Sequence, residues 1–153
     1  MPTRARNPVS AGARWLARCS QSESTVRAAW MSGDFAIIPS GIAWLVAEVP
    51  LPPSVDAMQR IRSEELGPVL AHPLRNVAWW LVPLDGAELL HHVRQLTLYP
   101  AGWPLCCPPV QRPAAGRVWL EKPDGSGRLT DPTALGLALD PGGSLKLPAE
   151  AFC

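Results

Sequence analysis

Apolar and polar residues alternate along this chain with periods that change every ten residues or so. Near the N-terminus, apolar residues recur at helical spacing and predict two short helices, over residues 10–20 and 23–31. Ser22 or Ser24 can cap the second helix, because serine side chains accept hydrogen bonds from free backbone N–H groups. The chain is therefore expected to open with two consecutive helices.

Two apolar runs follow, at residues 35–39 and 42–49. Both runs are rich in residues that favour strands, and Ser40-Gly41 separates them. A glycine between two apolar runs is typical of a tight turn. This stretch is predicted to form two strands of one hairpin.

The next segment, residues 52–67, gives the clearest helical pattern. Ser54 is the expected cap and Gly67 the expected stop. The apolar residues at helical spacing predict an inward stripe made of Val55, Met58, Ile61 and Leu66.

The remaining sequence predicts a mixture of short strands and helices. In order, we expect a short strand, a turn at residues 74–76, a strand at 77–82, a helix at 85–96 capped by Asp85, strands at 96–99, 104–107 and 118–121, and a helix that Asp131 caps with Pro132 in its first turn. This order favours an α+β domain over residues 9–140, with a largely antiparallel or mixed sheet, helices packed on it and one core. Residues 1–8 are expected to form a flexible arm and residues 141–153 a loose tail.

Composition narrows the class of protein further. Hydrophobic residues make up 47% of the 153 residues, so the chain can bury a core. The net charge is +1, which gives no overall field that would attract nucleic acid. No apolar run reaches the length of a membrane span or a secretory signal. We therefore expect a cytoplasmic protein with no membrane partner and with reduced cysteines.

Single motifs give no catalytic chemistry. Cys106 and Cys107 are adjacent, whereas metal sites use cysteines two to four residues apart so that both thiolates reach one ion. On a strand, one of the two should face the core and the other should face away. His91 and His92 diverge in the same way on a helix, and no glycine-rich phosphate loop is present. These residues are interpreted as structural.

The order of segments resembles the primase-polymerase (archaeo-eukaryotic primase-like) domain of bacterial bifunctional DNA primase/polymerase proteins. The resemblance runs from about residue 12 to residue 120, through SAGARWLA, IPSG, AWLVAEVP and RNVAWWLVP. Its best-matching part is CCPPVQRPAAGRVWL, in which a strand enters Pro-Pro and a polar loop leads through Gly-Arg into an aromatic strand. The resemblance implies an α+β fold and, in active members, metal-dependent nucleotidyl transfer.

Active members, by this resemblance, hold two metal ions with an Asp-x-Asp pair, a histidine and a third acid. The pair would fall on Glu48 and Pro50, the histidine on or beside Ala78, and the third acid near Thr97. Proline has no side-chain oxygen, and a single carboxylate cannot hold two magnesium ions. The resemblance therefore implies a domain that has lost its catalytic residues.

The expected function is a catalytically inactive binding or regulatory module. Its partner would be nucleic acid or another protein, and no cofactor is expected. The alternative is a residual nucleotide-binding or nucleotidyltransferase enzyme that uses Glu48 with one magnesium ion. The candidate nucleic-acid contacts are Arg60, Arg62, Arg75, Arg112 and Arg117 for phosphates and Trp80, or its neighbour Trp79, for stacking.

Overall fold

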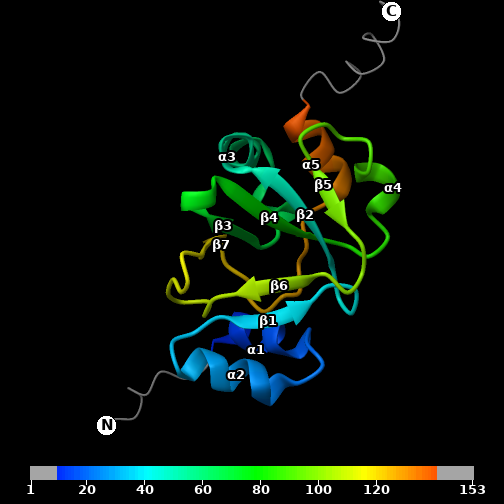
Figure 1. Cartoon of the computed structure of the whole chain (residues 1–153). Helices are drawn as coiled ribbons and strands as arrows, with labels where there is room; N and C mark the ends of the chain where they lie inside the picture. The colour runs from blue at the N-terminus through cyan, green and yellow to red at the C-terminus, as the bar shows by residue number, and fades with distance from the viewer. Residues whose placement is uncertain (1–9, 141–153) are drawn as a thin grey trace, which may run out of the picture.

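A computed structural model of the chain describes residues 10–140. The predicted arm at residues 1–8 and the predicted tail at residues 141–153 lie outside the described residues. The described part is an α+β fold in layers (Figure 1). Its helices are α1 (Ala11–Arg18), α2 (Glu23–Met31), α3 (Leu51–Arg60), α4 (Ala87–Leu90) and α5 (Pro132–Leu139), with 3-10 turns η1 (Ser63–Glu65) and η2 (Pro73–Arg75).

The centre of the fold is a five-stranded, wholly antiparallel sheet. In spatial order its strands are β5 (Thr97–Tyr99), β2 (Leu45–Pro50), β4 (Val77–Val82), β3 (Val69–His72) and β7 (Val118–Glu121). The predicted α+β class and the antiparallel sheet are confirmed. The predicted turn between β3 and β4 is also present, where Asn76 takes the left-handed conformation (φ 60°) that ends the turn.

A second sheet of two strands, which we call the ribbon, pairs β1 (Ala36–Pro39) with β6 (Pro104–Cys107). The predicted hairpin between the runs at 35–39 and 42–49 is therefore wrong. The turn itself exists, because Gly41 has φ 107° and donates its N–H to Trp44 O at 2.8 Å. It leads from one sheet into another, however, and β2 pairs with β4 and β5 instead.

Side chains alternate along the strands, so the five-stranded sheet has two different faces. We call the face that carries Val46, Glu48 and Trp79 the ribbon face, because β1, β6, α1 and α2 pack against it. The opposite face, which carries Ala47 and Trp80, is the helix face, because α3, α4 and α5 cover it. The single core expected from the sequence is thus two apolar clusters, one on each side of the sheet.

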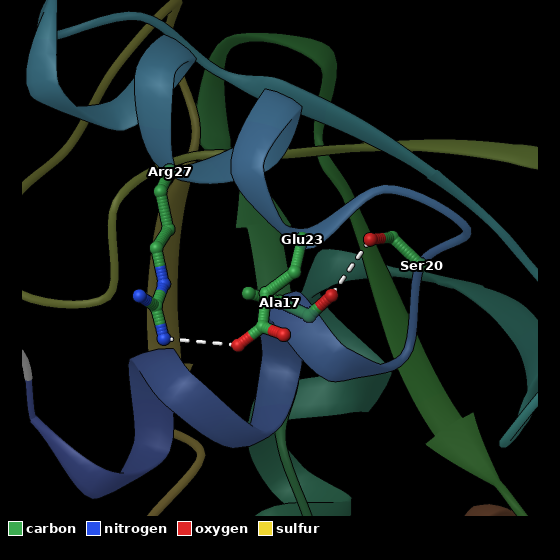
Figure 2. Close-up of polar contacts among 4 residues, drawn as sticks. All are labelled: Ala17, Ser20, Glu23 and Arg27. Carbon is green, nitrogen blue, oxygen red and sulfur yellow. Dashed lines mark hydrogen bonds and ion pairs between the residues drawn. The ribbon is translucent and has the colours of Figure 1, made fainter.

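Serine residues cap both N-terminal helices: Ser10 caps α1, which was not predicted, and Ser22 caps α2, as predicted. Ser22 Oγ accepts a hydrogen bond from Thr25 N at 3.4 Å, and α2 spans the predicted residues. Figure 2 shows the corner between the two helices, where Arg27 pairs with Glu23 at 2.9 Å one turn away and Ser20 Oγ donates to Ala17 O at 2.6 Å. The Ser20 bond occupies a carbonyl at the end of α1, and the Glu23–Arg27 pair stabilises α2.

Helix α3 differs from its prediction at both ends. It begins at Leu51, because two prolines in its first turn need no hydrogen-bond partner for a backbone N–H. Ser54 is therefore inside the helix and is not its cap. The helix also ends at Arg60, well before Gly67, since Ile61 is extended and buries its side chain. Val55, predicted to face inward, is 41% exposed.

Helix α4 differs from its prediction, whereas helix α5 agrees with it. Helix α4 is a single turn with Gly86 at its N-terminus, so Asp85 is not a cap and the predicted helix over residues 85–96 is too long. A Cβ at Gly86 would lie 2.9 Å from Pro132 Cγ, which explains the glycine. Helix α5 is as predicted, with Asp131 accepting a hydrogen bond from Ala134 N at 2.9 Å. None of the helices within residues 10–140 is both long and apolar enough to cross a membrane.

Candidate functional site

Glu48 lies near the middle of β2 on the ribbon face, and its side chain is half-buried. Its Oε1 accepts hydrogen bonds from Trp79 Nε1 and from the Tyr99 hydroxyl, both at 2.9 Å. Trp79 pairs with Glu48 across β2 and β4, while Tyr99 lies diagonally opposite on β5. A carboxylate on a largely apolar face is thus held by two aromatic donors, which offset the cost of its partial burial.

The positions carried over from the primase-polymerase resemblance converge on this part of the sheet. Glu48 and Pro50 are two residues apart on β2 and share the ribbon face. Thr97 pairs directly with Glu48 from β5. Ala78 points to the helix face, whereas its neighbour Trp79 occupies the ribbon face. These residues do not fit a two-metal site, because only one of them has a carboxylate.

Arg117 lies over the other side of this cluster. Its guanidinium carbon is 4.6 Å from the ring centroid of Trp79, and its Nη1 donates to Cys106 O at 3.2 Å. The residue follows Gly116, whose φ is 79° and where a Cβ would lie 3.0 Å from the His72 ring. A side chain at Gly116 would be strained at this φ and would crowd the His72 ring, so glycine favours the loop path that places the cation of Arg117 on the indole beside Glu48.

Tyr99 and Trp103 form the aromatic edge of the site. Their rings stack with centroids 4.1 Å apart and planes 6° from parallel. Ser40 fixes the Trp103 backbone from both sides, since Ser40 N donates to Trp103 O at 2.9 Å and Trp103 N donates to Ser40 Oγ at 3.2 Å. Partial burial, the hydrogen bond to Glu48 and the charge of Glu48 raise the pKa of Tyr99.

The sequence-predicted phosphate contacts divide between two regions, and two of them lie at this site. Arg117 stacks on Trp79, as described. Arg75 is exposed in the turn between β3 and β4, and its positive charge is close enough to act on Tyr99. Because its two arginines outnumber the single carboxylate of Glu48, this end of the ribbon face suits an anionic ligand.

The other three predicted arginines lie elsewhere. Arg112 donates to Trp30 O at 3.1 Å and so connects the loop after β6 to α2. Arg60 donates to Ala138 O at 2.9 Å, and the exposed Arg62 follows two residues later on the side of the helix face. The structure therefore does not bring the five arginines into one surface.

Trp80, the predicted stacking residue, is fully buried on the helix face. Its Nε1 donates to Ser54 Oγ at 3.0 Å, and Ser54 Oγ donates in turn to Val49 O at 3.5 Å. No face of this indole is open to a nucleic-acid base. The aromatic rings near the surface of the ribbon face are those of Tyr99 and Trp103 instead.

Cys106 and Cys107 lie on β6, and their side chains point to opposite sides as expected for neighbours on a strand. Cys107 is fully buried in the cluster beneath the ribbon face, and Cys106 is half-buried. Burial raises the pKa of the Cys107 thiol well above its usual value, so the thiol stays protonated. The backbone of this pair serves the fold, since Trp30 Nε1 donates to Cys107 O at 3.0 Å.

Sequence reasoning identified Glu48 and Arg117 but missed Tyr99 and Trp103. Tyr99 stands two residues from Thr97 on a predicted strand, so the shared face of this pair was readable. Its contact with Glu48 depends on β5 lying beside β2, which no local pattern specifies. Comparison of the chain with known protein families, with curated proteins and with solved structures found no match.

Proposed function

We propose that this chain is a non-catalytic binding module of primase-polymerase-like fold. Its ligand would bind the part of the ribbon face that carries Glu48, Tyr99 and Arg117, which we call the open end. The observation that carries the proposal is the state of Glu48. Its Oε1 already accepts two hydrogen bonds at 2.9 Å, and the neighbouring carried-over positions hold Pro50 and Thr97. Glu48 thus acts as a structural acceptor, with no second carboxylate beside it.

Metal-dependent transfer needs more oxygen ligands than this face offers. Magnesium ions in phosphoryl-transfer sites are held by several carboxylates and by the substrate phosphates. Within residues 10–140, no group of three or more His, Cys, Asp or Glu side chains is placed to hold a metal ion. The residual enzyme that would use Glu48 with one magnesium ion is accordingly the weaker candidate.

Binding is supported by the groups that remain. Arg75 and Arg117 can contact phosphates, while Tyr99 and Trp103 provide flat aromatic surface at the same edge. Arginines beside aromatic rings suit single-stranded nucleic acid, because every base has a stacking face and every nucleotide a charge. An acidic protein segment is the second candidate, because its charge would suit Arg75 and Arg117 and because Ile37, 56% exposed on the outer side of the ribbon, offers an apolar contact.

The test is titration of a fluorescently labelled single-stranded oligonucleotide, followed by anisotropy at several salt concentrations. Arg75→Ala should weaken binding and reduce the slope of log affinity against log salt by about 1. Arg62→Ala is the matched control, because this exposed arginine lies on the other side of the sheet, and it should leave the slope unchanged.

Two outcomes would overturn nucleic acid as the ligand. One is the absence of binding by the unaltered chain at low salt. The other is an equal loss in both variants, which would indicate diffuse attraction rather than a site. Either result would direct the search to an acidic protein partner at the same face.

A further inference from the structure

Helix α5 is made almost entirely of apolar residues, yet part of its surface is exposed to solvent. No charged residue stands between Asp131 and Asp140, and the exposed Thr133 is the one polar side chain among them. A helix with so few polar side chains is expected to bury most of its surface. Leu135 and Leu139 are buried on the helix face, but Leu137 is 57% exposed on the outer side.

Leu137 stands at a hollow of about 340 Å³ and forms part of its wall. The rest of the apolar lining comes from Ala134 and Ala138 of α5 and from Ile61 just after α3. Arg60 closes part of the hollow, because its guanidinium donates to Ala138 O at 2.9 Å. The same surface therefore carries an exposed apolar side chain and a hollow whose lining is partly apolar and partly charged.

Charges of both signs border this hollow. Arg62 and Glu65 both line it. The Arg62 side chain is 73% exposed, and its ion pair with Glu64 is long, at 3.9 Å. A surface with a single sign of charge would repel a second copy of itself, whereas this one offers a partner for each of its own charges.

We propose that α5 and the neighbouring hollow form the interface of a homodimer with two-fold symmetry. In a two-fold interface the same patch meets itself, so Leu137 of each copy fills the hollow of the other. Arg62 of one copy then faces Glu65 of the partner subunit, and the reverse contact follows by symmetry. The occupant is a second copy of this chain because knob, hollow and both charges occur within one patch.

This interface is separate from the ligand site proposed above. Helix α5 covers the helix face, and Glu48 lies on the other side of the sheet. A dimer formed through α5 leaves the open end of the ribbon face free in both subunits. The dimer would thus present two ligand sites, and loss of dimerisation would leave the single-site affinity unchanged.

The first test is sedimentation equilibrium over a range of protein concentrations, for the whole chain and for Leu137→Asp. The unaltered chain should show a reversible monomer-dimer equilibrium, and Leu137→Asp should be monomeric throughout. Leu74→Asp is the matched control, because Leu74 is 92% exposed in the turn between β3 and β4 and lies outside the patch. It should dimerise as the unaltered chain does. Circular dichroism checks that each variant is folded.

The second test exchanges the charges. Arg62→Glu and Glu65→Arg should each raise the dimer dissociation constant by up to about fivefold, the range of exposed ion pairs, and the double exchange should restore it. A chain that is monomeric at all concentrations overturns the proposal. So does a dimer that Leu137→Asp leaves intact, since such a dimer uses another surface.

Discussion

Two neighbouring tryptophans show how differently the two faces of the central sheet are built. Trp80, on the helix face, donates its indole N–H to Ser54, a neutral acceptor that is itself fully buried. Trp79, on the ribbon face, donates to Glu48, a charged acceptor that is half-buried. Both indoles are almost wholly buried and both N–H groups are bonded, yet only Trp79 carries a cation on its ring.

The hydrogen bond from Trp80 to Ser54 belongs to the core, whereas the one from Trp79 to Glu48 belongs to the candidate site. Three helices close the helix face, and a neutral hydroxyl satisfies the indole there at little cost. The ribbon covers the opposite face only in part, and the carboxylate at its open end lies among arginines and aromatic rings. A charge is tolerated where solvent and donors can reach it, and for this reason we place the proposed ligand site on the partly covered face.

The largest loss of stability should come from a substitution on the helix face. Trp80→Ala would leave a cavity and an unpartnered Ser54 hydroxyl, and should lower the free energy of unfolding by about 3–5 kcal/mol. Urea denaturation followed by circular dichroism measures this loss. Leu74→Ala, at a fully accessible position, is the control and should change stability by less than about 0.5 kcal/mol. A small effect of Trp80→Ala would mean that the two faces are equally open.

An intermediate effect is expected at the open face. Glu48→Ala would leave the Trp79 N–H and the Tyr99 hydroxyl without their acceptor and should cost about 1–3 kcal/mol in the same denaturation experiment. Glu48→Gln keeps an acceptor oxygen at this position and should cost less. If Glu48→Gln also abolished the heat of binding a magnesium-nucleotide complex in calorimetry, the residual enzyme would become the better interpretation.

The smallest effect is on proton affinity. Tyr99 is the single tyrosine of the chain, so its phenolate absorbance reports this residue alone. Its pKa should lie above that of free tyrosine, and should fall in Glu48→Ala, which removes both the hydrogen bond and the negative charge. Glu48→Gln, which removes only the charge, should give a value between the two.

The sign of the linked stability change follows from that direction. A pKa that is higher in the folded chain than in the unfolded chain stabilises the fold below the unfolded pKa, and this stabilisation disappears as the pH rises through the folded pKa. Alkaline titration of the unaltered chain should therefore weaken the open face first. A Tyr99 pKa that is identical in the unaltered chain and in Glu48→Ala would contradict the hydrogen bond between the two residues.

Local sequence patterns predicted the helices, strands and turns better than they predicted which of these elements contact one another. The cap at Asp131 and the turn before Asn76 depend on nearby residues only, and both were predicted. Ser54 was misassigned as a cap, because its hydroxyl is used by Trp80 from a different strand. The turn at Gly41 was found, but the choice of β6 as the partner of β1 depends on packing across the whole domain.

In the candidate site, too, single residues could be predicted from the sequence but their contacts could not. Glu48 was singled out by the resemblance to the primase-polymerase domain, and Arg117 as one of the candidate phosphate contacts. The contact of Arg117 with the Trp79 ring depends on the passage of Gly116 beside His72, and the hydrogen bond from Tyr99 depends on the order of strands. Neither arrangement follows from spacing along the chain.

The ribbon has a consequence for how the chain is made. β1 is synthesised early, but its only strand partner within residues 10–140 is β6, and most of the central sheet lies between them in sequence. Contacts between distant segments form slowly, because a long loop must close before they contribute. Trp30 of α2 likewise cannot form its hydrogen bond to Cys107 O until β6 has been synthesised. On the ribosome, the first helices to emerge thus wait for the second half of the domain before they can complete their packing.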